Sequence, residues 1–251
     1  MLRFGRAALQ ASASPHVSVR RALESSRLGS QVTVGGWLRT VRTSKTASFA
    51  ELSDGSCSQS LQVVMPPASA AGLSTGSAVR VTGTMEVGPH ASQRSELQAS
   101  HVELVGSAPL DYPLQKKRHT REYLRDIGHL RPRSRLMGSV MRVRDALMRS
   151  VQKYFEGREF LQVQTPIITS IDCEGAGDMF EVKAPGNEGY FGKPAFLTVS
   201  GQLQAEILAC ALSRVYTVGP TFRAENSHTP RHLAEFWYAR HENSESKSAL
   251  C

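Results

Sequence analysis

Five short runs of strand-forming residues, separated by turn signals, fill the stretch from residue 32 to residue 106. An Asp54–Gly55 pair and a Pro66–Pro67 pair mark two of the turns. Short strands at this spacing bury one face when the sheet closes on itself, so they predict a small closed or partly open β-barrel. The expected strands cover residues 32–43, 47–54, 60–65, 78–88 and 96–106.

The solvent face of this barrel is predicted to carry an aromatic residue. Side chains alternate between the two faces of a strand, and Ala50 and Leu52 belong to the apolar phase, which leaves Phe49 on the wet face. Five-stranded barrels of the OB type bind single-stranded nucleic acid by stacking bases on aromatic side chains near basic groups. Arg42 and Gln62 are candidates for contacting the same bases. The alternative is that Phe49 covers a loop or a domain interface.

The net charge of +8 is concentrated in two segments. Residues 1–29 contribute +4 and residues 109–135 contribute +5, while the rest of the chain sums to −1. The internal basic segment favours a polyanionic partner, although a solvated basic linker explains it equally well. No apolar run approaches the length of a membrane span, so no membrane association is expected. The four cysteines have no metal-binding spacing, which indicates a reducing compartment.

The first 25 residues have the composition of an organelle transit peptide. They are rich in Arg, Ala and Ser, and they lack the continuous apolar core of a secretory signal. A mitochondrial matrix location is therefore expected, with residues 1–25 outside the fold. The alternative is a disordered N-terminus that is rich in arginine by chance.

A long amphipathic helix is predicted after a basic hinge at residues 108–135. Apolar side chains recur at steps of three and four from Leu136 to Phe155, which is the spacing of one helix face. Gly157 ends this helix, and residues 160–165 form a strand that Pro166 terminates. The chain is thus expected to be α+β, with a five-stranded barrel at residues 26–107 and a second domain from residue 136.

Several motifs of the second domain occur in the order of one enzyme family. The helix and its strand are followed by Ser-Gly-Gln-Leu-Gln-Ala-Glu at residues 200–206, and by Phe-Arg-Ala-Glu and Arg-His-Leu-Ala-Glu-Phe within residues 222–236. These resemble motif 1, the amino-acid-binding segment and motif 2 of the class II aminoacyl-tRNA synthetases, in the aspartyl/asparaginyl branch. With the barrel, the resemblance covers residues 18–237 and is strongest to asparaginyl members of mitochondrial type. It implies that residues 136–238 are the first part of an antiparallel α/β catalytic domain.

The resemblance implies an enzyme that joins an amino acid to ATP and then transfers it to tRNA. Two anions meet in the first step, so fixed positive charge matters most at the transition state. By resemblance, Arg223 is catalytic and holds the α-phosphate of ATP, while Phe236 stacks on adenine. Further contacts with the nucleotide or the tRNA end are implied for Glu225, Arg231 and His232.

Amino-acid choice is expected to depend on Gln202 and Glu206, whose i, i+4 spacing places them on one helix face. Aspartyl enzymes are similar here but have a Lys three residues after the Gln, where this chain has Ala205. The Glu206 carboxylate would repel aspartate and accept a hydrogen bond from a side-chain amide. Leaving such a buried acceptor unpaired costs about 1–3 kcal/mol, so L-asparagine is the expected substrate. Ser200 and Glu174 are the other amino-acid-binding candidates, with Glu174 at the substrate ammonium or the tRNA end.

The resemblance also implies the partners of the protein. They are tRNA(Asn), ATP with Mg²⁺, and a second copy of the chain in a homodimer. The residues that match anticodon-contacting positions are Arg42, Phe49 and Gln62. Two other functions stay open: a non-catalytic fragment that binds tRNA through the barrel and the basic hinge, and an aspartate–tRNA ligase. The alternative for Gln202 and Glu206 is a solvated first helical turn.

After Phe236 the sequence departs from the family. The family continues with an acidic strand and, much later, with motif 3 and its second ATP-binding arginine, whereas Arg240 stands here at an acidic position. Residues 239–251 are expected to be a divergent, disordered tail because most of them are polar. No metal ligand is expected in this chain, since the Mg²⁺ ligands belong to a C-terminal part that it lacks. As written, the chain is expected to be an inactive or partial isoform.

Overall fold

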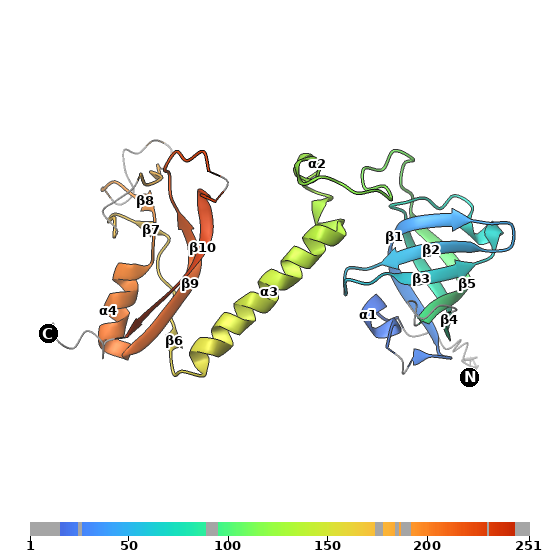
Figure 1. Cartoon of the computed structure of the whole chain (residues 1–251), viewed down its shortest axis with the longest axis horizontal. Helices are drawn as coiled ribbons and strands as arrows, with labels where there is room; N and C mark the ends of the chain where they lie inside the picture. The colour runs from blue at the N-terminus through green and yellow to red at the C-terminus, as the bar shows by residue number, and fades with distance from the viewer. Residues whose placement is uncertain are drawn as a thin grey trace, which may run out of the picture. The chain divides into compact units, whose positions relative to one another are not determined.

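The structure is a computed structural model, and it describes residues 16–24, 27–88, 95–173, 178–183, 186, 192–229 and 231–243. The chain divides into two compact units, residues 1–143 and residues 144–251. Figure 1 shows a β-barrel in the first unit and a small sheet with one packed helix in the second. Among the described helices, none has the length and apolar character needed to cross a membrane.

The first unit is built on a closed five-stranded barrel, as the sequence predicts (Figure 1). Its strands are β1 (Gln31–Thr43), β2 (Ser48–Ser53), β3 (Leu61–Met65), β4 (Ala78–Val87) and β5 (Ser95–Gly106). They follow the order β1-β2-β3-β5-β4, and β4 pairs with β1 to close the barrel. The 3-10 helix η2 (Pro67–Ala70) lies in the connection between β3 and β4. Closure gives each strand two neighbours for its backbone hydrogen bonds.

Alternate side chains of the strands fill the barrel interior. Leu52, Leu61 and Leu97 are fully buried, and each such side chain stabilises the fold by about 1.5–3 kcal/mol. Gly83 lets β4 and β5 approach closely, because a Cβ atom there would lie 2.1 Å from the carbonyl oxygen of Gln98. The phase predicted for β2 is confirmed, since Ser48, Ala50 and Leu52 are buried while Phe49 is only half-buried.

Residues 16–24 belong to the barrel unit, which corrects the expectation that the first 25 residues lie outside the fold. Helix α1 (Val19–Ala22) buries Val19 and Ala22 completely in the barrel core, next to Val17. The Val17 N–H donates to the carbonyl oxygen of Thr33 at 2.9 Å. Composition suggested a targeting segment because residues 1–25 are rich in Arg, Ala and Ser without a continuous apolar core, yet Val17, Val19 and Ala22 each pack against the barrel. Residues 1–15, where the rest of the expected transit peptide falls, lie outside the described residues.

Asp54 ties this N-terminal segment to the β2–β3 connection. Its carboxylate accepts hydrogen bonds from the Val19 N–H at 2.9 Å and from the N–H and hydroxyl of Ser56 at 2.9 and 2.7 Å. Burial alone would raise the pKa of Asp54, but these hydrogen bonds outweigh it and hold the pKa below its ordinary value.

The barrel unit is therefore expected to lose stability when the pH falls below about 4. A carboxyl group with a depressed pKa contributes stability above its unfolded pKa and loses that contribution as the pH falls through its folded pKa. Melting temperatures of the wild type and of Asp54→Asn, measured from about pH 7 down to about pH 2.5, check this. The variant should be less stable near neutrality and should show a shallower acid-dependent loss. If the melting temperatures of the two proteins fall equally with pH, Asp54 is not the group responsible for the acid-dependent loss of stability.

Three helical elements follow the barrel: α2 (Arg121–Asp126), η3 (Arg131–Arg133) and α3 (Arg135–Glu156). The helix predicted at residues 136–155 is confirmed and is one residue longer at each end. No residue of α3 is buried, and its apolar stripe is exposed by 38 to 66 % at Leu136, Val140, Val143 and Leu147. A stripe of this kind normally packs against another surface.

The second unit contains a three-stranded sheet in the order β10-β9-β6 (Figure 1). Its strands are β6 (Leu161–Gln162), β9 (Arg214–Phe222) and β10 (Glu235–Asn243); β7 (Ile168–Thr169) and β8 (Phe196–Leu197) form a separate pair. The strand expected at residues 160–165 is thus shorter than predicted. Helix α4 (Gln202–Leu212) packs Ala205 and Ala209 against Val163 and Val215. The end of α3 also contacts this sheet, because Phe155 stacks on Tyr216 with ring centroids 4.4 Å apart.

Strand β10 corrects the expected start of the disordered tail. Residues 239–243 pair with residues 214–218 of β9, and their burial alternates along the strand. Cross-strand pairing gives this polar stretch partners that its composition alone does not reveal. Residues 244–251 lie outside the described residues.

Candidate functional site

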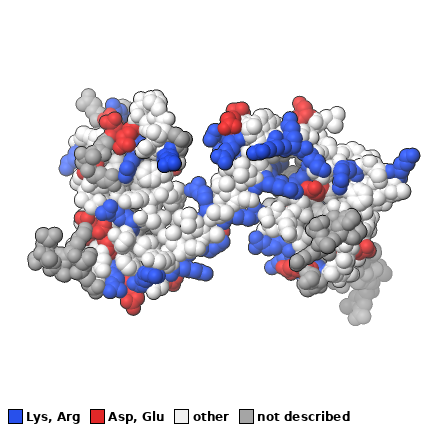
Figure 2. All heavy atoms as spheres, viewed as in Figure 1, with Lys and Arg blue, Asp and Glu red and all other residues white. Residues whose placement is uncertain are grey.

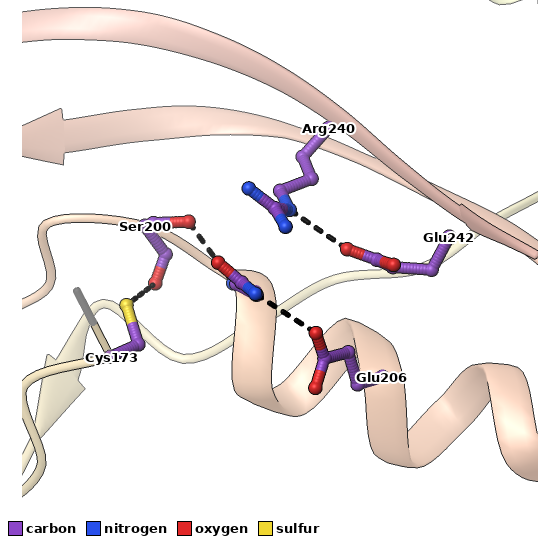
Figure 3. A network of polar contacts seen from close by, with 6 residues as sticks. Cys173, Ser200, Glu206, Arg240 and Glu242 are labelled. Atoms are coloured by element: carbon purple, nitrogen blue, oxygen red, sulfur yellow. Dashed lines mark hydrogen bonds and ion pairs between the residues drawn. The ribbon is translucent and has the colours of Figure 1, made fainter. Parts of the chain in front are cut away.

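The first turn of α4 brings together three predicted amino-acid-binding residues. The side-chain amide of Gln202 donates to a carboxylate oxygen of Glu206 at 2.9 Å, which confirms that the two lie on one helix face. The Gln202 N–H donates to the Ser200 hydroxyl at 3.2 Å, and Ser200 is only 1 % exposed. The Cys173 thiol donates to the carbonyl oxygen of Ser200 at 3.5 Å (Figure 3). Ser200 thus holds the helix start, and Gln202 orients the Glu206 carboxylate.

Backbone hydrogen bonds fix the segment before α4 against two other parts of the unit. The Thr198 N–H donates to the carbonyl oxygen of Ile167 at 2.8 Å, and the Phe222 N–H donates to the carbonyl oxygen of Thr198 at 2.9 Å. The Thr198 hydroxyl donates to the carbonyl oxygen of Ser200 at 2.6 Å. The turn that carries the predicted amino-acid-binding residues is therefore anchored next to the end of β9, where Arg223 follows.

Gly201 allows the close packing on which this turn depends. A Cβ atom at Gly201 would lie 2.4 Å from the hydroxyl oxygen and 3.1 Å from the Cβ of Thr165. Because Thr165 is branched at Cβ, it cannot swing away as a long side chain would. A larger residue at position 201 must therefore shift the start of α4 or the loop that holds Thr165.

We expect Gly201→Ala to destabilise the second unit by about 1–3 kcal/mol through overpacking. The matched control is Gly219→Ala in β9, where an added Cβ meets nothing within 4 Å. Thermal unfolding of both variants measures the difference, and Thr165→Ala in the Gly201→Ala background should restore part of the loss. Equal melting temperatures for the two single variants would contradict the packing account.

Arg223 and Phe236 face one another at the other side of this site. Arg223 directly follows β9, and its N–H donates to the carbonyl oxygen of Ala234 at 3.0 Å. The guanidinium carbon lies 5.4 Å from the centre of the Phe236 ring. A planar cation that can hold phosphate oxygens bidentately therefore lies beside an aromatic face. This pair fits the phosphate and base of a nucleotide such as ATP.

The remaining motif 2 candidates are on the connection between β9 and β10. Glu225, Arg231 and His232 are all exposed, and His232 Nδ1 is hydrogen-bonded to the Thr229 hydroxyl. The structure does not bring them against the α4 turn. Glu174, the last of the amino-acid-binding candidates, lies outside the described residues.

An ion pair on β10 was not predicted from the sequence. The Arg240 guanidinium lies 2.8 Å from the Glu242 carboxylate, and Glu242 is only 6 % exposed. Figure 3 shows the two side chains pointing toward one another, and β10 contacts α4, which carries Glu206. Burial alone would lower the pKa of Arg240, but Glu242 and Tyr238 raise it above its ordinary value. The alternation of Phe236, Tyr238, Arg240 and Glu242 on one face is the signal that could have revealed this pair.

The described residues do not fit a bound Mg²⁺ ion. They contain no group of three or more His, Cys, Asp or Glu side chains that could hold a metal. The buried carboxylate of Glu242 is neutralised by Arg240. A nearby cavity of about 260 Å³ is also unsuited to a cation or a phosphate, because its lining has no charged side chain. The cavity is lined by Gln162, Gln164, Thr165, Pro166, Ile167, Thr198, Gly201, Thr217, Val218, Gly219, Pro220, Thr221 and Tyr238.

The anticodon-binding candidates share the outer face of the barrel. Arg42 on β1 lies directly opposite Phe49 on β2, and Gln62 on β3 lies opposite Glu51, two residues further along β2. The structure therefore places a basic, an aromatic and an amide side chain on neighbouring strands. We refer to Arg42, Phe49 and Gln62 as the base-stacking face.

Comparison with protein families identifies the chain. Residues 120–247, just over half of the sequence, match the family described as "tRNA synthetases class II (D, K and N)". The chain belongs to the class II tRNA synthetases. Residues 32–105 of this synthetase chain match the family described as "OB-fold nucleic acid binding domain". Both matches confirm the predicted fold class, an OB barrel followed by part of a class II catalytic domain.

Relatives of this synthetase chain are asparagine–tRNA ligases. Those of Synechocystis sp. and Geobacter sulfurreducens are 51 % and 50 % identical to it, over 89 % and 88 % of the chain but only 53 % and 52 % of their own length. The chain thus spans about half the length of the curated relatives it matches. The asparaginyl-tRNA synthetase of Pyrococcus horikoshii complexed with asparaginyl-adenylate has a TM-score of 0.80 at 26 % identity, over 90 % of this chain and 52 % of its own.

Proposed function

We propose that the α4 turn and the Arg223–Phe236 pair serve an asparagine–tRNA ligase, which activates L-asparagine with ATP and transfers it to tRNA(Asn). The observation that carries this proposal is the Gln202–Glu206 pair on the first turn of α4. A carboxylate oriented by a neighbouring amide accepts a hydrogen bond from the side chain of asparagine and repels the side chain of aspartate. The identity of about 50 % to asparagine–tRNA ligases supports the same substrate.

The chemistry of activation needs positive charge where the carboxylate of the amino acid meets the α-phosphate. Arg223 supplies a fixed guanidinium there. Phe236 stacks on adenine, which keeps the α-phosphate beside this guanidinium. Arg231 and His232 bind the outer phosphates or the acceptor end of tRNA, and Glu225 accepts from the nucleotide or that end. The described residues supply no ligand set for Mg²⁺, so no step of this proposal depends on that ion.

At the barrel, the base-stacking face supports recognition of the anticodon. A base stacked on Phe49 gains about 1–3 kcal/mol, and Arg42 and Gln62 lie close enough to contact its neighbours. This face also supports a second candidate function, a non-catalytic tRNA-binding fragment, because the barrel has a core of its own. Filter binding of the 251-residue chain to tRNA with a GUU anticodon tests it. An aspartate–tRNA ligase is disfavoured, since the position of the required Lys is the fully buried Ala205.

Two further proposals concern assembly and location. The exposed apolar stripe of α3 supports a homodimer through this helix. The arginine-rich N-terminus supports import into the mitochondrial matrix, but any processing must then occur before His16, because Val17, Val19 and Ala22 belong to the barrel core. Sedimentation of the purified chain and N-terminal sequencing of the protein from mitochondria test these two proposals.

ATP–pyrophosphate exchange tests the proposed reaction. A protein that contains these residues together with the rest of a class II catalytic domain should exchange with asparagine and not with aspartate. A preference for aspartate would overturn the assignment. That the 251-residue chain is inactive on its own stays a prediction, and asparagine-dependent exchange by that chain would contradict it.

A further inference from the structure

A cluster of three arginines lies at the edge of the base-stacking face. Strand β1 has a bulge between Leu38 and Thr40, so Arg39 has no direct partner on β2. Thr40 lies opposite Glu51 on the outer face of the barrel. Only two residues of β2, or about 7 Å, separate Glu51 from Phe49.

The start of α3 brings two more arginines to this edge. Arg135 forms an ion pair with Glu51 at 3.1 Å, and Arg142 donates to the carbonyl oxygen of Gly55 at 2.7 Å. All of these residues belong to the first compact unit. In the part of the chain that the structure describes, no hydrogen bond or ion pair engages the Arg39 guanidinium. Its donors are therefore available to a ligand.

The charges of the cluster do not balance, since three guanidinium groups lie around one carboxylate. Burial and then the repulsion from Arg135 and Arg142 lower the pKa of Arg39, and Glu51 offsets only part of this. Figure 2 shows that Lys and Arg side chains gather on this face of the barrel unit, with few acidic side chains among them. Guanidinium groups that repel one another and are partly desolvated favour an anion that bridges them.

We propose that Arg39, Arg135 and Arg142 bind a phosphate of the RNA backbone next to the base-stacking face. Glu51 holds Arg135 in place before RNA binds and gives it up to the phosphate afterwards. The distance between Glu51 and Phe49 suits a single nucleotide whose base stacks on Phe49. The inference deepens the proposed function and rests on the role of the barrel in binding tRNA.

Salt dependence of RNA binding distinguishes this site from the base-stacking face. The probes are a tRNA transcript with a GUU anticodon and poly(U), bound to the full chain between about 50 and 300 mM salt. Arg39→Gln and Arg135→Gln should each weaken binding several-fold to both probes and reduce the slope of log K against log salt by about 0.7–0.9. Phe49→Ala should weaken binding with the slope unchanged, because stacking releases no counterions. Arg149→Gln is the matched control, since Arg149 pairs with Asp145 on the exposed surface of α3.

Glu51→Gln shows whether Arg135 binds RNA or whether its ion pair with Glu51 is purely structural. It should leave affinity unchanged or raise it, because it removes the group that competes with phosphate for Arg135. If Glu51→Gln weakens binding as much as Arg135→Gln does, the pair only docks α3 and the proposal is wrong. Unchanged slopes for both arginine variants would also overturn it. Slope changes seen with poly(U) in a chain that does not bind the tRNA would support this site while rejecting the proposed function.

Discussion

Replacing Arg223 with Gln is expected to lower the rate of asparaginyl-adenylate formation by about 10²–10³-fold. The backbone of Arg223 is held after β9 by its hydrogen bond to Ala234, and the guanidinium lies beside the Phe236 ring. In the proposed reaction this guanidinium meets developing charge on the α-phosphate without rearranging, so we expect its contribution to be larger in the transition state than in substrate binding. The measurement is single-turnover adenylate formation by a protein with a complete catalytic domain.

Two variants make the Arg223 result specific. Arg223→Lys keeps the charge but loses the bidentate fork, so it should recover only part of the rate. Phe236→Leu removes the stacking surface and should mainly raise the KM for ATP. If Arg223→Gln changes the KM for ATP but not the rate of the chemical step, Arg223 binds the nucleotide without stabilising the transition state.

Replacing Val19 with Ser is expected to destabilise the barrel unit by about 3 kcal/mol and to lower its melting temperature by about 10 °C or more. Val19 is fully buried, so the change removes apolar contacts and places a hydroxyl in the core. Arg20→Ser is the matched control, because Arg20 is exposed on the same short helix. Scanning calorimetry of the full chain measures both. A Val19→Ser melting temperature equal to that of Arg20→Ser would show that residues 16–24 are not part of the folded barrel.

Local sequence patterns were sufficient to predict the elements whose apolar side chains repeat at a regular spacing within one short segment. The barrel strands, the α3 helix and the shared face of Gln202 and Glu206 follow from alternation or helical spacing within a few residues. The position of Phe49 on the outer face of β2 follows from the same alternation, because Ala50 and Leu52 on the other phase are buried.

The features that local patterns do not reveal depend on partners far along the chain. Val19 resembles part of a targeting segment by composition, but its N–H donates to Asp54, 35 residues later. Arg240 lies in a polar stretch whose composition resembles that of a disordered tail, but β10 pairs it with Thr217 on β9. The ion pair of Arg135 with Glu51 spans 84 residues, and no local pattern encodes it. Composition misled at residues 16–24 and 239–243, because helix–barrel and cross-strand contacts stabilise these short stretches.

The choice between asparagine and aspartate tests the central claim most directly. The measurement is kcat/KM for ATP–pyrophosphate exchange with each amino acid, for a complete synthetase that contains these residues and for its Glu206→Gln variant. The wild type should prefer asparagine, and the variant should lose about 5- to 150-fold of that preference, which corresponds to the roughly 1–3 kcal/mol of one hydrogen-bond acceptor left unpaired. A wild type that prefers aspartate, or a preference that Glu206→Gln leaves unchanged, would contradict the account.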